Sequence, residues 1–395
     1  MHLGIVRRLV SYTLVLSLVM RVIGLHAGEQ GSQPRGATRR AELEQRLNVA
    51  VAHFATATKV PGLAVGVIAD GQVFLSDARG VVGPADSEKR PVDRQTVFHL
   101  ASLAKPFVAT AVMALIEQKK LRLDDTVIKH LVYFRLADER FSEITIRQLL
   151  THVSGLPDVA DYEWANPQHD VGALERYVRS LASVGLRSAP GEKYAYTNIG
   201  YEVLGDVIAK ASGRPFETYM ADAVFRPLFM TSSTFMLPEV PRERLAMPSV
   251  RDSSGLFVAT THFPYNRIHA PSSTLYSTVD DMLRWLRANL RGGELDGHRI
   301  LTADGYRVLF SEGVERSKGP IRSVQDLGWS TLILDGITVH GHGGHDRGFR
   351  ASMLFAPQAD GAVVVMTNGD ADNVKVDSLG LQLLGIVVGR DWSGF

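Results

Sequence analysis

The chain has 395 residues, enough for one large domain or two ordinary ones with a sizeable hydrophobic core. Its 45% hydrophobic and 22% charged residues exclude an intrinsically disordered chain and a membrane protein with several spans. The formal net charge is +1, so the composition offers no basic excess for binding nucleic acid. The sequence contains no cysteine, which excludes thiol nucleophiles, disulfides, and zinc or iron–sulfur sites built on cysteine.

The first 27 residues have the pattern of a secretory signal peptide. Two arginines precede an apolar run from Leu9 to Met20, and Ala27 stands where a signal peptidase would cleave. An uncleaved membrane anchor is the alternative, but Arg21 ends the apolar run well short of the roughly 20 residues that span a membrane. We therefore expect a periplasmic or secreted protein with no membrane span after cleavage.

The next part of the chain predicts a helix followed by a β-hairpin. Residues 28–40 are polar and contain Gly and Pro, which is typical of a flexible lead-in. Apolar residues at helical spacing then predict a helix from Ala41 to about Thr56. Two β-rich runs, Leu63–Ala69 and Val73–Ala78, flank the pair Asp70-Gly71, which is a strong local signal for a hairpin.

The middle of the chain, from Ser102 to about Leu295, is mostly helical in pattern. Ala104–Gln118 is apolar on nearly every side, as in a buried helix. β-Pattern returns near the C-terminus in two further hairpins before a last apolar helix: Ser330–Leu334 with Ile337–His340, Phe349–Phe355 with Ala362–Thr367, and the helix Asp377–Val388.

Strands near both ends, with a long helical insertion between them, indicate the fold class. The economical arrangement is an α/β (α+β) fold with one antiparallel sheet built from both chain ends and flanked by their helices, plus an all-helical lobe. We expect a single domain over residues 41–395. Its sheet lobe would comprise about 41–101 and 315–395, and its helical lobe about 102–314.

Ser102 and Lys105 are the first candidates for catalytic chemistry. Ser102 lies where a β-like stretch gives way to the helix predicted from Ala104, and backbone N–H groups at a helix start favour developing negative charge. The one-turn spacing places the Lys105 ammonium on the same face as the hydroxyl. Lysine can serve as base to a serine nucleophile once burial brings its pKa from about 10.4 towards neutral. The alternative is a helix-capping serine beside a lysine that extends to solvent.

Tyr196 and Asn198 are the second candidates. They stand where a Pro-Gly loop precedes a helix with an apolar face, so both side chains can point into one cleft. The tyrosine can pass protons, and the asparagine amide can hold a substrate carbonyl or orient Lys105. An amphipathic tyrosine beside a helix-capping asparagine is the alternative.

The run from His340 to Asp346 contains three histidines and three glycines. Its His-x-His-x-x-His-Asp order resembles a zinc motif, but no His or Cys follows His345 to complete such a site. The glycines favour instead a strand whose backbone lies close to substrate, with one histidine over the nucleophile. We therefore expect no metal and no other cofactor.

Taken in order, Ser102-x-x-Lys105, Tyr196-x-Asn198 and His342-Gly343-Gly344 resemble the motifs of the penicillin-recognising serine hydrolases. The resemblance is to the branch that contains class C β-lactamases, D,D-carboxypeptidases, D-amino-acid peptidases and the β-lactamase-like esterases. It extends from about Leu43 to Asn368. Further matching stretches are Val60–Val65, Leu149–Leu156 (LLTHVSGL), Pro190–Gly205 and Tyr276–Met282.

The resemblance implies a β-lactamase/transpeptidase-like fold with the site between the sheet and the helical lobe. It makes Ser102 the acylated nucleophile, Lys105 its base partner and Tyr196 the proton shuttle, as general base in deacylation and acid to the leaving group. Asn198 would position substrate. The backbone N–H groups of Ser102 and His345 would form the oxyanion hole. His152, within the LLTHVSGL stretch, is expected to be structural.

The third motif departs from the β-lactamase pattern, because His342-Gly343-Gly344 stands where those enzymes have Lys-Thr-Gly. We expect these residues and His345 to bind substrate, although a neutral histidine holds a carboxylate less strongly than lysine. Arg350, or its neighbour Arg347, is expected to supply the missing positive charge at the cleft mouth; a solvated loop arginine is the alternative. Pro271–Leu275 lacks the Gly-Gly usual in the family, which leaves this loop without an expected shape.

The sequence therefore predicts a serine hydrolase that forms an acyl-enzyme on an ester, a D-amino-acid peptide or a β-lactam. The alternative is a catalytically silent homologue that binds cell-wall peptide or a protein partner. A conventional α/β-hydrolase has no support, since the chain has no Gly-x-Ser-x-Gly elbow. Neither the choice among the three carbonyl substrates nor the oligomeric state follows from the motifs.

Overall fold

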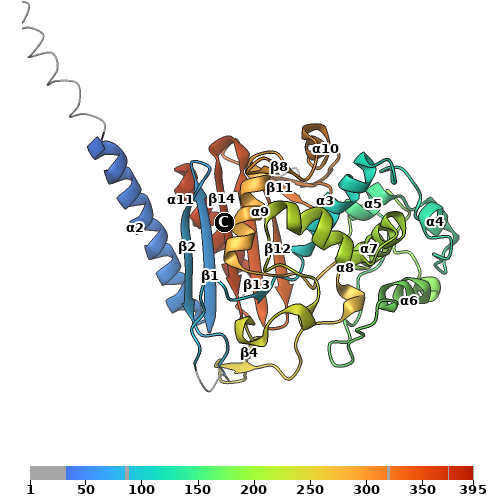
Figure 1. Ribbon diagram of the computed structural model, residues 1–395, viewed down its shortest axis with the longest axis horizontal. Coiled ribbons are helices and arrows are strands. Elements are labelled where there is room, and N and C mark those ends of the chain that lie inside the picture. Colours follow the sequence, from blue (N-terminus) through green and yellow to red (C-terminus); the bar gives the residue numbers. More distant parts are fainter. Residues whose placement is uncertain (1–32, 85–88, 318–320, 372, 395) are drawn as a thin grey trace, which may run out of the picture. The chain divides into compact units, whose positions relative to one another are not determined.

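The computed structural model describes residues 33–84, 89–317, 321–371 and 373–394 (Figure 1). The chain forms two compact units, Met1–Val49 and Ala50–Phe395, and the second contains the sheet and the candidate site. The signal peptide predicted for residues 1–27 lies outside the described residues. Within the described ranges, no helix is both long and apolar enough to cross a membrane.

Helix α2 (Gln33–Thr58) begins eight residues before the predicted start at Ala41. The flexible lead-in predicted for residues 28–40 is therefore wrong for 33–40, while 28–32 lie outside the described part. Pro34 stands in the first turn of the helix, where a missing N–H breaks no hydrogen bond. Residues 38–40 are exposed, so this turn of the helix carries no apolar periodicity that the sequence could reveal.

A single eight-stranded antiparallel sheet is built from both ends of the chain, as predicted (Figure 1). All three predicted hairpins are present, and in two of them the Asp-Gly pairs adopt the left-handed backbone of a tight hairpin turn, with φ of 50° and 68° at Asp70 and Gly71 and 49° and 77° at Asp335 and Gly336. The strands, in spatial order, are β2 (Gln72–Gly80), β1 (Gly62–Ala69), β14 (Gly361–Thr367), β13 (Phe349–Ala356), β12 (Ile337–Asp346), β11 (Ser330–Leu334), β10 (Arg322–Gln325) and β9 (Val314–Ser317).

Helices cover both faces of the sheet. The C-terminal helix α11 (Asn373–Val388) packs on one face, where Gly380 lies against Ser352 of β13. Helix α9 (Val279–Leu290) packs on the opposite face, where the side chain of Leu283 fills the space beside Gly66 of β1. The boundary predicted for the helical lobe, 102–314, is therefore wrong for α9, which belongs with the sheet.

The remaining helices form the helical lobe beside the sheet (Figure 1). They are α3 (Ala104–Glu117), α4 (Val127–His130), α5 (Ile146–Leu150), α6 (Ala173–Ser180), α7 (Ile199–Ser212), α8 (Phe216–Met220) and α10 (Ala303–Val308). Short two-stranded sheets join the loops: β3 (Phe98–His99) with β6 (Tyr276–Ser277), β4 (Ser249–Arg251) with β5 (Phe257–Ala259), and β7 (Glu294–Leu295) with β8 (His298–Arg299).

Helix α3 is buried from Ala104 to Leu115, as its all-round apolar sequence predicts. The ring of Phe107 on α3 stacks on Trp285 of α9 with centroids 3.8 Å apart, and Trp285 is parallel to Trp329, which precedes β11. Large aromatic side chains contribute much of a core's buried apolar area. This stack therefore fixes the start of α3, and the serine before it, relative to the sheet.

Candidate active site

Ser102 lies in a tight turn directly before α3. The backbone N–H groups of Ala104 and Lys105 donate to the carbonyls of Ala101 and Ser102, at 3.0 and 3.1 Å. Ala101 has φ 49°, a left-handed conformation that redirects the chain between β3 and the helix. The predicted place of this serine at a helix start is therefore confirmed, and its hydroxyl lies near the positive end of the helix dipole.

Lys105 is fully buried, and its Nζ has three oxygen partners. Nζ lies 3.0 Å from Oγ of Ser102, 2.6 Å from Oδ1 of Asn198 and 2.8 Å from the carbonyl oxygen of Ser272. The last two atoms can only accept, whereas a serine hydroxyl can also donate. A neutral amine therefore fits, with two N–H groups donating and its lone pair accepting from Ser102. An ammonium group fits as well, so Lys105 can take up a proton without moving.

Burial lowers the pKa of Lys105 to about 7, from an ordinary value of 10.5. The carboxylates of Glu202, Asp158 and Asp346 oppose this effect at longer range, because their negative charge favours the ammonium form. In the described part of the chain, the hydrogen-bond partners of Nζ are all uncharged. A substantial fraction of Lys105 is therefore neutral near pH 7, as a general base must be.

Tyr196 also contacts the Ser102 hydroxyl. Its hydroxyl donates to Oγ of Ser102 at 2.9 Å, and its ring stacks on His152 with centroids 4.4 Å apart. Burial raises the pKa of Tyr196 well above its ordinary value, so the phenol is protonated at rest. This state suits the predicted role as acid to the leaving group. The predicted role as general base in deacylation requires that this proton leave first.

Asn198 holds the lysine rather than the helix end. It is the N-cap of α7, yet its side chain makes no capping bond, because Oδ1 accepts from Lys105 and Nδ2 donates to Oδ1 of Asp158 at 3.0 Å. The backbone N–H of Asn198 also donates to Oδ1 of Asp158, at 2.7 Å. Of the two roles open to this amide, the contacts favour orienting Lys105 over the predicted positioning of substrate.

The LLTHVSGL stretch and the residues after it hold the Tyr196–Asn198 segment in place. The N–H of Thr197 donates to Nδ1 of His152 at 3.2 Å, and its hydroxyl donates to the carbonyl of Pro157 at 2.6 Å. Burial lowers the pKa of His152 well below its ordinary value, so the ring is neutral. These contacts agree with the structural role expected for His152.

A second buried network fixes the loop that supplies the Ser272 carbonyl. Glu202, one turn after Asn198 on α7, is fully buried, and its Oε1 accepts from the Ser272 hydroxyl at 2.7 Å. The same oxygen lies 2.8 Å from Nδ1 of His269. The adjacent Pro271 packs against Gly205, where any Cβ would lie 2.1 Å from the proline ring. The loop that lacks the family's Gly-Gly pair is thus held by side-chain contacts.

The end of β12 that carries His342-Gly343-Gly344 is paired on one edge only. Its pairing with β13 continues to Asp346↔Phe349, whereas its pairing with β11 stops at Ser330↔Gly341. Beyond Gly341, no strand of the described residues occupies the other edge. Backbone groups at a free strand edge can pair with an extended substrate, as in β-strand addition.

Gly344 lets this strand approach the turn that contains Ser102. A Cβ at Gly344 would lie 2.2 Å from the carbonyl oxygen of Leu100, two residues before Ser102. The strand and the turn therefore lie in backbone contact, which is what an oxyanion hole formed by Ser102 and His345 would require. That oxyanion hole stays a prediction.

His342 is neutral and held in one orientation. Its Nδ1 donates to the carbonyl oxygen of Gly343 at 2.6 Å, so Nε2 carries the lone pair. Burial, and secondarily the charge of Lys105, lowers the pKa of His342 to about 3. It therefore offers substrate a hydrogen-bond acceptor rather than a positive charge.

The three histidines of the run do not converge on one point. His340 and His342 project from one face of β12 and His345 from the other, because side chains alternate along a strand. Nδ1 of His340 lies 2.6 Å from the Thr331 hydroxyl, and Nε2 of His345 lies 3.7 Å from the carboxylate of Asp377. No group of three or more metal-ligating side chains occurs among the described residues, so the donors do not fit the zinc alternative.

Most of the candidate residues line a cleft of about 400 Å³, a volume within the range of small-molecule sites. Its lining comprises Ser102, Tyr162, Tyr194, Tyr196, Asn198, Arg316, Gln325, Ser330, His342, Gly343, His345 and Asp377. The structure thus brings together three motifs that are separated by about 90 and 145 residues of sequence.

A family model described as Beta-lactamase matches residues 47–385. The chain belongs to the Beta-lactamase family. Penicillin-binding protein 4 of Amycolatopsis lactamdurans is 28% identical over 341 residues, which cover 84% of this chain and 86% of that protein. Protein flp of Staphylococcus aureus (strain MW2) is 25% identical over 346 residues, 86% of this chain. The matched part is 66% of flp, so the chain spans just under two thirds of that relative's length.

The fold is also shared with a solved structure. The octameric penicillin-binding protein homologue from Pyrococcus abyssi superposes with a TM-score of 0.77 at 25% sequence identity, covering 89% of this chain and 78% of that chain. The predicted β-lactamase/transpeptidase-like fold, with a large antiparallel sheet and a helical lobe, is therefore confirmed.

Arg350 does not line the cleft that contains Ser102. The expectation that it supplies positive charge at the cleft mouth is therefore wrong. Its guanidinium pairs with Asp370 at 2.5 Å and donates to the carbonyls of Asp346 and Phe349, at 2.6 and 2.7 Å. These bonds tie β12, β13 and the segment after β14 together. Arg347 is exposed and is likewise absent from the cleft lining.

Arg316, which the sequence analysis did not single out, lines the cleft instead. It projects from the edge strand β9, with its guanidinium carbon 4.8 Å from the centroid of the Tyr194 ring and Nη1 donating to the Ser330 hydroxyl at 3.3 Å. Its charge helps to lower the pKa of His342 and His152, so it influences the two histidines nearest to Tyr196. Only the pairing of β9 with β10 brings it here, and no local signal marks it.

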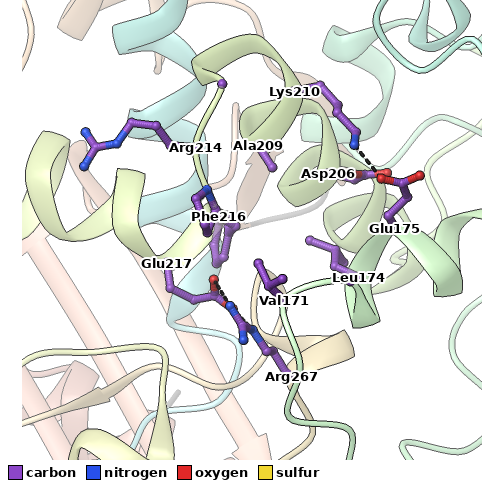
Figure 2. A pocket seen from close by; sticks show the side chains of 13 residues that line it. Val171, Leu174, Glu175, Asp206, Ala209, Lys210, Arg214, Phe216, Glu217 and Arg267 are labelled. Atoms are coloured by element: carbon purple, nitrogen blue, oxygen red, sulfur yellow. Dashed lines mark hydrogen bonds and ion pairs between the residues drawn. The ribbon is translucent and has the colours of Figure 1, made fainter.

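A larger cavity, of about 460 Å³, lies in the helical lobe and shares no lining residue with the cleft (Figure 2). Its charged groups are already paired: Lys210 with Glu175, and Arg267 with Glu217 through two bonds of 2.7 and 3.0 Å (Figure 2). Asp206 accepts from a tyrosine hydroxyl at 2.7 Å. The lining contains no serine, whereas the predicted nucleophile, Ser102, lines the smaller cleft.

Proposed function

We propose that this protein is a serine hydrolase that forms an acyl-enzyme on Ser102. One observation carries the proposal: Oγ of Ser102 is hydrogen-bonded to both Lys105 and Tyr196. Lys105 is a buried amine that can accept the serine's proton, and Tyr196 is a phenol that can donate one. A serine nucleophile needs such an adjacent base, and a leaving group needs such an acid. A protein that only binds has no need to bury a lysine against its serine.

In acylation, Oγ of Ser102 attacks the substrate carbonyl carbon while its proton passes to Nζ of Lys105. The carbonyl oxygen becomes negative and would accept from the backbone N–H groups of Ser102 and His345. When the carbon–leaving-group bond breaks, Tyr196 donates its proton to the departing oxygen or nitrogen. Tyr196 then takes the proton from Lys105, which returns to the neutral form.

In deacylation, water attacks the acyl carbon and the same groups work in reverse. The proton of the water passes through Tyr196 to Lys105 and then to Oγ of Ser102 as the ester bond breaks. Because Tyr196 gives its own proton to Lys105 as it accepts one from the water, this relay accommodates a phenol whose pKa is raised by burial. No cofactor takes part in either step.

The substrate class is proposed at the level of an ester, a D-amino-acid peptide or a β-lactam. Family relatives named as penicillin-binding proteins support a carbonyl substrate of this kind. The neutral His342 in place of a lysine favours the ester and peptide members over efficient β-lactam hydrolysis.

The proposal is tested with purified protein, its Ser102→Ala variant and Ser254→Ala, an exposed turn serine that serves as the matched control. Each is assayed with p-nitrophenyl butyrate, nitrocefin and a D-alanine p-nitroanilide, and intact mass spectrometry records the acylated protein. We expect turnover and an adduct in the wild type and in Ser254→Ala, and neither in Ser102→Ala. Undiminished turnover in Ser102→Ala would overturn the proposal, and no adduct or turnover in any protein would favour a silent binder.

A further inference from the structure

A further cavity, of about 220 Å³, lies beside the cleft that contains Ser102, on the face of the sheet that α11 covers. We call it the side cavity, and its inner lining, not shared with the cleft, is Leu332, Val339, Gly341, Ser352, Leu354 and Leu381. Four of these six residues are aliphatic, and Ser352 is the one polar side chain among them. The side cavity is thus an apolar space between β11, β12, β13 and α11.

Two glycines of β12, Gly341 and Gly343, line this space. Gly341 pairs with Ser330 of β11 and with Leu354 of β13, and Gly343 pairs with Ser352. Directly paired residues of neighbouring strands project to the same face, so Gly341 and Gly343 stand on the face that α11 covers. Any larger residue at these positions would project towards the side cavity.

The side cavity is continuous with the cleft that contains Ser102. Five lining residues are common to both spaces: Arg316, Ser330, His342, Gly343 and Asp377. They stand where β11 ends and the edge of β12 becomes free. A substituent of a substrate held against this edge can therefore pass beside Gly343 into the side cavity.

We propose that the side cavity is a substrate subsite that receives an unbranched aliphatic chain attached to one side of the scissile carbonyl. This inference rests on the proposed serine hydrolase function and specifies its substrate. The charged side chains of Arg316 and Asp377 lie at the entrance shared with the cleft, whereas the inner lining of the side cavity is mostly aliphatic. Leu332 and Leu381 are half-buried, so an aliphatic chain would remove apolar surface of both partners from water.

The expected gain is about fourfold in kcat/KM for each methylene group that enters an apolar pocket. Two series of substrates distinguish the side of the carbonyl. The first series lengthens the acyl side and comprises p-nitrophenyl acetate, butanoate, hexanoate and octanoate. The second lengthens the alcohol side and comprises ethyl, butyl and hexyl acetate, whose hydrolysis is measured by pH-stat titration. We expect kcat/KM to rise by on the order of tenfold for two added methylenes in one series.

Substitutions then fill or enlarge the side cavity. Leu332→Phe and Leu381→Phe are expected to lower the hexanoate-to-acetate ratio of kcat/KM, or its alcohol-side counterpart, about tenfold. Leu381→Ala is expected to favour the longest chain. Leu256→Phe, at an exposed leucine outside both cavities, is the matched control and keeps the wild-type ratio.

A ratio of two substrates on one protein is unaffected by partial unfolding, which lowers both rates equally. The inference is overturned if acetate is hydrolysed in a Ser102-dependent way but neither series depends on chain length. It is equally overturned if both phenylalanine variants keep the wild-type ratio. Loss of Ser102 dependence would instead overturn the proposed function itself.

Discussion

Nζ of Lys105 lies 3.0 Å from Oγ of Ser102, at a position where the lysine side chain is completely buried. Burial disfavours the ammonium form and lowers the pKa of Lys105 to about 7. The carboxylate of Glu202 on α7 acts in the opposite direction and raises this pKa. The reactivity of Ser102 therefore depends on a balance between desolvation and a buried negative charge.

The first prediction is an acidic limb in the pH profile of kcat/KM, with an apparent pKa of about 7. Lys105 must be neutral to accept the proton of Ser102, so activity rises as pH increases through the pKa of Lys105. Steady-state rates with p-nitrophenyl butyrate between pH 5 and 9, corrected for spontaneous hydrolysis, measure it.

Glu202→Gln shows whether that limb belongs to Lys105. The substitution keeps an acceptor for Ser272 but removes the negative charge that raises the pKa of Lys105, so the limb is expected to move to lower pH. Glu243→Gln, at an exposed glutamate, is the control and keeps the wild-type limb. A limb at the same pH in all three proteins contradicts the assignment.

The second prediction concerns Tyr196→Phe. The ring can still stack on His152, but Ser102 loses a hydrogen-bond donor and the leaving group loses its acid. We expect kcat to fall on the order of 10²–10⁴-fold, as for removal of a general acid or base. Substrates with an acidic leaving group need protonation least, so p-nitrophenyl esters should lose less than alkyl esters. Equal losses for both would argue against an acid role.

Much of the fold could be predicted from the sequence because its signals are local. Each of the three hairpins consists of two β-rich runs around a short turn, and in two of them both residues of an Asp-Gly pair adopt the left-handed backbone of the turn. Strands β9 and β10 gave no such signal. Their sequences VERS and RSVQ are polar and show no clear β-pattern, and their place in the sheet is set by pairing with neighbouring strands.

The site was predicted where side chains define it and missed where the backbone or a distant strand does. Ser102, Lys105 and Tyr196 carry recognisable spacing, and the structure brings them together. The third partner of Lys105 is a backbone carbonyl, that of Ser272, which any residue could supply. Arg316 reaches the cleft only because β9 pairs at the sheet edge, so the motifs pointed to Arg350 as the source of positive charge instead.

The third prediction is that Arg316 selects substrates by charge. Its guanidinium is held against Tyr194 and the neutral hydroxyl of Ser330, and no carboxylate of the described residues lies within ion-pair distance. Arg316→Gln is expected to lower kcat/KM roughly 10–100-fold for a substrate with a carboxylate near the scissile carbonyl, the worth of a charged hydrogen bond.

A matched neutral ester, measured alongside, isolates the charge effect, and Arg347→Gln is the control because Arg347 is exposed and outside the cleft. The loss should also shrink at high salt, since screening weakens a partly exposed ion pair. If Arg316→Gln changes both substrates equally, the arginine has a structural role only.

The fourth prediction is that Gly344→Ala impairs both folding stability and catalysis. The added methyl group would lie 2.2 Å from the carbonyl oxygen of Leu100 and 2.9 Å from the side chain of Leu103, so β12 must move away from the Ser102 turn. Overpacking of this kind typically costs 1–3 kcal/mol of unfolding free energy, which thermal denaturation measures as a lower Tm.

Catalysis should fall further than stability alone explains. Displacement of β12 by about 1 Å shifts any oxyanion donor on His345, and misplacement on this scale costs on the order of 10²-fold. Gly185→Ala, where the methyl group meets open space, controls for the substitution itself and is expected to leave Tm and kcat unchanged. If Gly344→Ala lowers Tm but retains full kcat at a temperature where it is folded, the strand does not supply a donor to the oxyanion.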